Sequence, residues 1–231
     1  MSNARRPIVI GHKGASAVAP ENTLASFRAA LEAGATAVEC DIHATRDGVP
    51  VIIHDATVDR TTDGSGRIDA MTLAEVQALD ASFGMEAFRG ERIPTLDELL
   101  TLVAGRATIS LEYKALDAVA PSVPILRKHD AMRWCTAWAF SADMLAEARR
   151  LMPELSRTQN VGRVESWDAV LAKARELESL GVSLSQDLVT PERVSAAKAR
   201  GLIFYTWTAN TPADWQRLID CDVDAIVTDD P

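Results

Sequence analysis

The feature that most constrains this chain is a repeated alternation of short apolar runs with amphipathic helical stretches. Between the first two runs, Leu24, Phe27 and Leu31 recur at helical spacing and Gly34 follows at a helix-stop position. Strands that alternate with helices form a parallel sheet, and eight such units favour a closed (β/α)8 TIM barrel of the α/β class. The expected strands are residues 8–12, 36–42, 108–113, 134–139, 155–161, 182–186, 202–208 and 224–228.

Two irregularities interrupt this repeat. The interval after the second strand is about twice the usual length, and it contains the turn-rich segment TTDGSGR and a helix start at Thr72 with Glu75 three residues on. We expect one domain spanning residues 1–231, with an insertion at about residues 50–93. The sequence stops at Pro231 directly after the eighth strand, so we expect no eighth helix and an uncovered groove between the last and first strands.

Charge and hydropathy argue against several classes of partner. The formal net charge is −9, without the clustered Lys and Arg that nucleic-acid binding requires. No run approaches the roughly 18 apolar residues of a membrane span, and the N-terminal segment lacks a signal-peptide core. We therefore expect a cytoplasmic protein without nucleic-acid or membrane partners.

Cys40, Cys135 and Cys221 lie far apart in apolar runs, which predicts buried thiols.

Carboxylates recur where aliphatic side chains would make a better core. Glu39 and Asp41 share one face of the second strand because they are two residues apart, and Glu112 has apolar neighbours on the third strand. Their C-terminal positions are where barrels of this kind hold their chemistry. Converging carboxylates repel one another unless neutralised, and hard cations such as Mg²⁺ or Ca²⁺ prefer oxygen ligands. We predict a metal site at these three residues.

A second interpretation of the same carboxylates stays open at this point. One or more of them could instead form a salt bridge with Lys13, Lys114 or Arg46. Lys114 shares a strand face with Glu112, so the salt bridge and the metal site both remain open as interpretations.

Two histidines are predicted to border the same opening. His12 closes the first strand and His54 closes the short apolar run of the insertion, and imidazoles suit proton transfer near neutral pH. A purely structural hydrogen bond is the alternative role for each of them. His43 shares the face of the carboxylates, but we expect it at the rim without a chemical role, and we expect His129 in a solvated loop.

Longer ordered blocks add a resemblance. The segments GHKGASAVAPENTLASF, ECDIHATRDGVPVIIHDATVDRTTDGSGRI, IPTLDELL and LEYK together resemble the glycerophosphodiester phosphodiesterase family of TIM-barrel enzymes. The blocks YTWTAN and IVTDDP are similar to that family's last two strands, so the resemblance covers nearly the whole chain. It implies metal ligation by Glu39, Asp41 and Glu112, and an acid/base pair formed by His12 and His54.

The resemblance also implies residues that bind substrate. It places Lys114 near the phosphate and Trp207 beside the alcohol portion, while Glu21 and Asn22 shape the first βα loop. Lys13 stands where the family usually has Arg, and an ammonium lacks the planar two-point grip of a guanidinium. We expect Lys13 to contact the phosphate nonetheless, with the substrate range left open.

The activity implied is metal-dependent hydrolysis of glycerophosphodiesters to glycerol 3-phosphate and an alcohol, a hydrolase reaction of lipid and glycerol metabolism. One histidine removes the proton of the nucleophile and the other protonates the leaving alkoxide. The alternatives are a related phosphodiesterase acting on lysophospholipids or another small phosphodiester, a catalytically silent phosphate-binding barrel, and an isomerase or aldolase on the same fold. Because family members usually continue into a sealing helix, we expect a homo-oligomer or the N-terminal segment to cover the gap.

Overall fold

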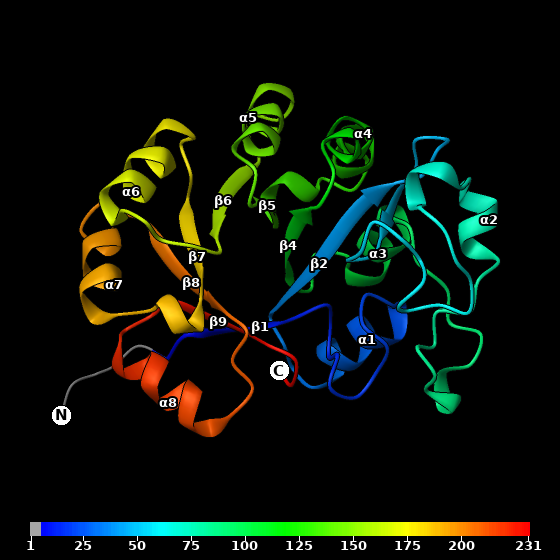
Figure 1. The fold of residues 1–231 in the computed structure, drawn as a ribbon, viewed down its shortest axis with the longest axis horizontal. Helices are drawn as coiled ribbons and strands as arrows, with labels where there is room; N and C mark the ends of the chain where they lie inside the picture. Colours follow the sequence, from blue (N-terminus) through cyan, green and yellow to red (C-terminus); the bar gives the residue numbers. More distant parts are fainter. Residues whose placement is uncertain (1–5) are drawn as a thin grey trace.

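The computed structural model describes residues 6–231, in which parallel strands close into a barrel (Figure 1). The strand order is β1-β2-β4-β5-β6-β7-β8-β9, and β9 pairs back onto β1. This arrangement confirms the predicted TIM-barrel fold. The strands are β1 (Ile8–Gly11), β2 (Ala37–Ala44), β4 (Thr108–Tyr113), β5 (Cys135–Ala139), β6 (Ser156–Val161), β7 (Gly181–Ser185), β8 (Ile203–Trp207) and β9 (Ala225–Thr228).

Helices form the outer ring of the barrel in Figure 1. Polar N-caps start most of them: the side chains of Thr23, Ser166, Thr190 and Thr211 each accept a hydrogen bond from a backbone N–H of the first turn, and Thr95 forms a capping box with Glu98. The helices are α1 (Leu24–Glu32), α3 (Leu96–Val103), α4 (Val119–Lys128), α5 (Ala142–Leu151), α6 (Trp167–Glu176), α7 (Pro191–Lys198) and α8 (Pro212–Asp220), with short 3₁₀ turns η3 (Leu116–Ala118), η4 (Ala131–Arg133) and η5 (Gln186–Leu188).

A small additional unit lies between β2 and α3. Its strand β3 (Pro50–Ile52) pairs antiparallel with the end of β2, and the helix start predicted at Thr72 is a capping box with Glu75. The unit has its own apolar cluster, which includes Val58, Ile68 and Val76. Its helical segments are η1 (Ile68–Ala70), α2 (Leu73–Gln77) and η2 (Glu86–Phe88). The division into one domain with an insertion at residues 50–93 stays a prediction.

An apolar cluster fills part of the barrel interior. Ile10, Ala37, Ala225 and Val227 pack there with Trp138, whose ring meets Tyr205 edge-on at a centroid distance of 4.8 Å. Polar side chains follow at the C-terminal ends of the same strands. This arrangement places the carboxylates at one mouth of the barrel, the end where barrels of this kind hold their chemistry.

No helix follows β9 in the described residues. Val9, on the outward side of β1, is 43% exposed, whereas Ile226 on the outward side of β9 is buried. The predicted cover by a second subunit or by the N-terminal segment stays a prediction, and residues 1–5 of that segment lie outside the described residues. Among residues 6–231, no helix is long and apolar enough to cross a membrane.

Candidate active site

Three buried carboxylates come together at the C-terminal mouth of the barrel. Asp41 on β2 lies opposite Glu112 on β4 in the strand register, and Glu39 lies two residues before Asp41. One oxygen from each of the three lies within 4.8 Å of the others, and the residues are between 1% and 8% exposed. The alternation of β2 and its register with β4 therefore bring together the three predicted ligands, although their role as ligands stays a prediction.

The electrostatics of this cluster fit a cation. Burial raises the pKa of Glu39 well above its usual value, and the charges of Asp41 and Glu112 raise it further. Burial also raises the pKa of Glu112, with Lys114 opposing and Asp41 adding to the rise. The Glu39 Oε1 atom is buried without a hydrogen-bond partner in residues 6–231. An unpaired carboxylate oxygen beside two other carboxylates is the donor set that Mg²⁺ or Ca²⁺ prefers.

Lys114 partly neutralises the cluster. Its Nζ lies 3.1 Å from Asp41 Oδ1 and also pairs with Glu112 Oε1, and these two carboxylates hold the pKa of Lys114 above its usual value despite its burial. Burial pushes the pKa of Asp41 upward, yet Lys114, His54 and Lys13 together hold it below its usual value. The salt bridge kept open as an alternative is thus present for Lys114.

The other two cations considered for that alternative are placed differently. Arg46 faces the insertion, where its guanidinium donates to Ala70 O and lies 3.4 Å from Glu75. Lys13 reaches Glu39 through its backbone N–H at 3.0 Å, while its Nζ pairs with Glu21 at 3.1 Å. The charged groups of Lys13 and Arg46 thus form their ion pairs with Glu21 and Glu75 and not with the three clustered carboxylates.

The loop after β1 contains residues in the left-handed backbone region, which is uncommon for residues other than glycine. Lys13 has a φ of 55° and Asn22 has a φ of 59°, both in the left-handed region. The Asn22 side chain donates to Asp41 Oδ2 at 2.8 Å and accepts from the Asp41 backbone N–H at 3.3 Å. Gly14 has a φ of 90°, and a Cβ there would lie 2.4 Å from Ser26 Oγ. This backbone path places the Lys13 N–H next to Glu39 and the Asn22 amide next to Asp41.

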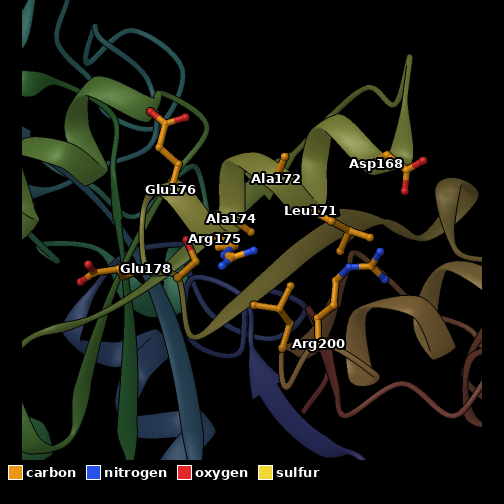
Figure 2. Close-up of a pocket in the computed structure, with 10 residues that line it drawn as sticks. Asp168, Leu171, Ala172, Ala174, Arg175, Glu176, Glu178 and Arg200 are labelled. Carbon is orange, nitrogen blue, oxygen red and sulfur yellow. The ribbon is translucent and has the colours of Figure 1, made fainter.

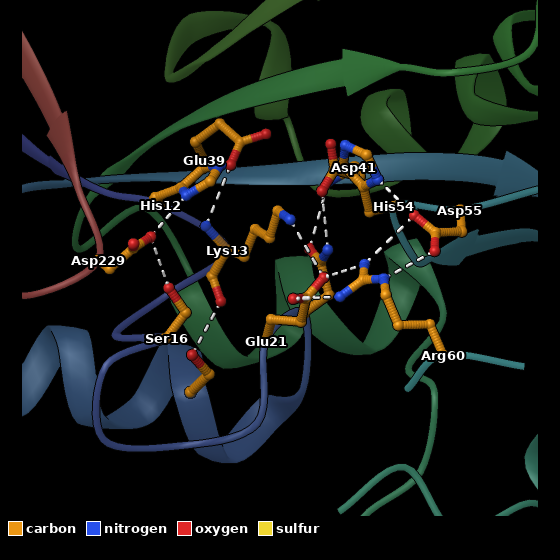
Figure 3. Close-up of polar contacts among 12 residues, drawn as sticks. His12, Lys13, Ser16, Glu21, Glu39, Asp41, His54, Asp55, Arg60 and Asp229 are labelled. Atoms are coloured by element: carbon orange, nitrogen blue, oxygen red, sulfur yellow. Dashed lines mark hydrogen bonds and ion pairs between the residues drawn. The ribbon is translucent and has the colours of Figure 1, made fainter. Parts of the chain in front are cut away.

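Each of the two histidines is oriented by its own carboxylate (Figure 3). His12 Nδ1 lies 2.6 Å from Asp229 Oδ1, and His54 Nδ1 lies 2.6 Å from Asp55 Oδ1. A carboxylate at Nδ1 favours the tautomer that carries its proton there, which leaves Nε2 available for proton transfer. Both imidazoles line the same pocket as the carboxylate cluster.

The orienting carboxylates are themselves well held. Asp229 also accepts from Ser16 Oγ at 2.9 Å and from Asn210 Nδ2 at 2.5 Å. Burial pushes its pKa upward, but the hydrogen bond and charge of His12 lead the contributions that lower it to about 2. The Arg60 hydrogen bond is the largest influence on Asp55 and holds its pKa below its usual value. Both side chains are therefore ionised at neutral pH.

Arg60 joins the insertion to the first loop (Figure 3). Its guanidinium donates to both oxygens of Glu21 at 2.8 Å and to Asp55 Oδ2 at 2.7 Å. Because Glu21 also pairs with Lys13, one network of ion pairs connects the loop after β1 with the residue that orients His54.

Sequence reasoning missed three residues of this arrangement: Asp55, Arg60 and Asp229. Asp55 follows His54 directly, which is a readable signal. Asp229 lies 217 residues from His12, and only closure of the barrel brings them together.

The pocket has a volume of about 190 Å³, and its remaining wall comes from β5, β6, β8 and β9 and from the residues directly after β5 and β8. Phe140 and Trp207 meet edge-on there at a centroid distance of 5.7 Å, and Lys114 Nζ lies 5.9 Å from the Phe140 ring. Trp138, Asn160 and Thr208 complete this side. All predicted catalytic, metal-binding and phosphate-binding residues line the pocket, together with Trp207, while Glu21 and Asn22 lie behind it in the first loop.

Two histidine placements differ from expectation. His43 is 8% exposed and does not lie at the rim, because β2 continues through it to Ala44 and β3 pairs with β2 at this position. Its Nε2 lies 3.1 Å from His54 O, and burial lowers its pKa. His129 is half-buried and pairs with Asp97 at 2.8 Å, so it is not a solvated loop residue.

Of the three cysteines predicted to be buried, Cys40 and Cys135 are buried, whereas Cys221 is only half-buried.

A larger hollow, of about 980 Å³, lies away from these groups (Figure 2). It is bordered by α6 and by the segments that lead into β7 and β8, which places it near the N-terminal ends of the strands. Arg175 and Arg200 stand there among Asp168, Glu176 and Glu178, so the charges are mixed. Chemistry in barrels of this kind takes place at the opposite end.

Comparison with known proteins gives a consistent result. The Glycerophosphoryl diester phosphodiesterase family matches residues 12–231. A glycerophosphodiester phosphodiesterase of Caldanaerobacter subterraneus is 34% identical over 98% of this chain and 95% of its own length. One of Bacillus subtilis is 29% identical over 98% of this chain and 84% of its own.

Solved structures are similar over nearly the whole chain. An Oleispira antarctica phosphodiesterase, in complex with the product sn-glycerol-3-phosphate, has a TM-score of 0.91 at 34% identity and covers 97% of this chain and 94% of that one. A Silicibacter pomeroyi structure described as a glycerophosphoryl diester phosphodiesterase has a TM-score of 0.89 at 31% identity, with coverage of 97% and 90%.

Proposed function

Because this chain belongs to the glycerophosphoryl diester phosphodiesterase family, we propose that it hydrolyses glycerophosphodiesters to glycerol 3-phosphate and an alcohol. The observation that carries the proposal is one pocket in which two carboxylate-oriented histidines border three clustered carboxylates. The glycerol 3-phosphate bound by the Oleispira antarctica relative supports the choice of substrate class. The protein is thus an enzyme, a phosphoric diester hydrolase.

A divalent cation, Mg²⁺ or Ca²⁺, would be held by Glu39, Asp41 and Glu112. When bound, it would offset the negative charge that builds on the phosphoryl oxygens. The unpaired Glu39 Oε1 and the raised pKa of Glu39 and Glu112 support this assignment, because the protein alone does not neutralise the three carboxylates. Lys13 and Lys114 add positive charge at the same pocket and would bind the phosphate.

The two histidines would divide the proton transfers. One removes the proton of the attacking hydroxyl, and the other donates a proton to the leaving alkoxide. If water attacks, glycerol 3-phosphate forms directly. If the neighbouring glycerol hydroxyl attacks, it forms a cyclic phosphate, which water then opens to glycerol 3-phosphate. Asp229 and Asp55 hold the Nδ1 protons, so that each Nε2 serves the pocket. Trp207 and Phe140 would border the alcohol portion of the substrate.

The test is release of glycerol 3-phosphate from glycerophosphocholine and glycerophosphoethanolamine, with and without chelator. We expect metal-dependent release that falls about 10²-fold or more in His54→Ala, since positioned acid/base groups contribute 10²- to 10⁴-fold. His129→Ala is the matched control, because His129 pairs with Asp97 outside the pocket. Metal binding without release from either diester would contradict the proposal, and a parallel assay with lysophosphatidylcholine would reveal a related phosphodiesterase.

A further inference from the structure

Two buried polar side chains in the pocket have no part in the chemistry above. They are Trp138 on β5, which is 2% exposed, and Asn160 on β6, which is 4% exposed. Trp138 Nε1 and Asn160 Oδ1 have no hydrogen-bond partner among the described residues, although both side chains line the pocket. Because buried polar groups are almost always paired, an unpaired donor and an unpaired acceptor on one pocket wall indicate a missing ligand.

Asn160 lies away from the phosphate end of the pocket, whereas Trp138 lies beside Glu112 in the strand register. In the order of the strands, β6 lies across the barrel from β1, which leads into His12 and Lys13. The cations Lys13 and Lys114 stand on the β1, β2 and β4 side with the carboxylates. A phosphate only accepts hydrogen bonds, so the Asn160 carbonyl oxygen would repel it. An alcohol hydroxyl both donates and accepts, and it matches the indole N–H together with the amide oxygen.

The two groups are held firmly enough to select a ligand. The Trp138 ring packs edge-on against Tyr205 and within the apolar cluster of the barrel, so its N–H points in one direction. Asn160 lies on a strand paired on both sides, with β5 and with β7. Fixed groups of this kind lose little freedom when they bind, which is the condition for specificity.

We propose that Trp138 and Asn160 form a subsite that binds a free hydroxyl of the glycerol group and so selects glycerol-bearing phosphoesters over alkyl ones. The inference rests on the proposed function, which supplies the phosphate end of the pocket. The choline or ethanolamine end is a poorer occupant, because its oxygen is esterified and its cationic nitrogen cannot accept from the indole N–H.

The probes are glycerol 3-phosphate, propyl phosphate, which lacks both hydroxyls, and inorganic phosphate, titrated calorimetrically into the protein in magnesium chloride. We expect the unaltered protein to bind glycerol 3-phosphate more tightly than propyl phosphate. Trp138→Phe removes the N–H and keeps most of the ring, and Asn160→Leu removes the amide at similar size. Each should weaken glycerol 3-phosphate binding about three- to tenfold, the range for one hydrogen bond, without changing propyl phosphate binding.

Matched controls come from unpaired groups elsewhere in the chain. Trp167 Nε1 and Gln159 Oε1 are also buried without partners in the part of the chain that the structure describes, but neither residue lines this pocket. Trp167→Phe and Gln159→Leu should therefore leave binding of all three ligands unchanged. Melting temperatures of every variant report whether the fold is kept, and the comparison of ligands on the unaltered protein tests the subsite even where a variant fails to fold.

Several results would overturn the subsite. For the unaltered protein, these are equal affinity for glycerol 3-phosphate and propyl phosphate, or no binding of any of the three ligands. For the Trp138 and Asn160 variants, they are an equal loss of affinity for both esters, or an equal loss of affinity for inorganic phosphate. The last result would mean that the two residues bind the anion. Failure of the proposed function is distinguishable. A protein that prefers glycerol 3-phosphate through Trp138 and Asn160 but releases nothing from the diesters keeps the subsite and loses the activity.

Discussion

At the scale of single residues, Glu39 is the most unusual group in the pocket. Its side chain is buried, one of its oxygens has no partner among residues 6–231, and two further carboxylates lie within 4.8 Å. Burial and these neighbours favour its neutral form, so the pKa is raised. A raised carboxyl pKa means that the ionised form destabilises the fold, and this cost grows as the pH rises above the usual value of 4.5.

Glu39→Gln should therefore separate stability from metal binding. In chelator at pH 7, we expect the variant to melt about 2–4 °C above the unaltered protein, since one charge leaves the cluster. Magnesium or calcium should raise the melting temperature of the unaltered protein and not that of the variant. Glu154→Gln, at an exposed position, is the control. A variant that melts lower in chelator and still gains from metal would contradict this account of the cluster.

At the scale of elements, the loop between β1 and α1 determines how the site is assembled. Its backbone brings the Lys13 N–H to Glu39 and the Asn22 amide to Asp41. Gly14 makes this path possible because it adopts a φ of 90° against the backbone of Ser26. The alternation of β2 selects which side chains face the barrel, and the loop then holds them.

Gly14→Ala should disturb both the fold and the site. A Cβ would lie 2.4 Å from Ser26 Oγ and 2.5 Å from its carbonyl carbon, so the loop must move. We expect the free energy of unfolding, measured in urea, to fall by about 2–4 kcal/mol and phosphodiesterase activity to fall with it. Gly34→Ala is a matched control: its φ is 95° with nothing within 4 Å of the added Cβ, so a loss of only about 1 kcal/mol is expected. Equal losses would mean that backbone strain, not the contact with Ser26, dominates.

At the scale of the whole molecule, the end of the chain closes the site as well as the barrel. β9 pairs with β1. The backbone N–H of His12 donates to Thr228 O at 2.8 Å, and the backbone N–H of Ala17 donates to Asp229 O at 2.9 Å. The Asp229 carboxylate then binds His12 and Ser16. Barrel closure and orientation of a proposed catalytic histidine are thus one structural event.

Asp229→Asn tests this coupling through the pH dependence of stability. The folded-state pKa of Asp229 is about 2 against a usual value of 3.8, so its ionised form stabilises the fold above about pH 4, and that contribution is lost as the pH falls toward 2. The variant should be less stable at pH 7, lose less stability between pH 4 and 2, and turn over substrate more slowly because His12 loses its orienting charge. Asp230→Asn, at an exposed neighbour, should match the unaltered protein. Parallel acid profiles for both variants would contradict the role of Asp229.

Much of this arrangement could be predicted from the sequence, because the signals are local. The strand and helix periods indicate the barrel, the two-residue spacing places Glu39 and Asp41 on one face, and Thr72 with Glu75 marks a helix start. Such patterns depend only on the geometry of one strand or one helical turn. The family resemblance extends them to the residues that line the pocket.

Only the tertiary structure decided which distant groups meet. Four features depend on strand register and barrel closure: the pairing of Asp229 with His12, the pairing of Arg60 with Glu21, the burial of His43 where β3 pairs with β2, and, within residues 6–231, the unpaired polar atoms of Trp138 and Asn160. The side-chain pattern of a strand determines which residues face inward, but not which residue lies across the interior. That partner is set by how all the strands tilt and close around a common axis.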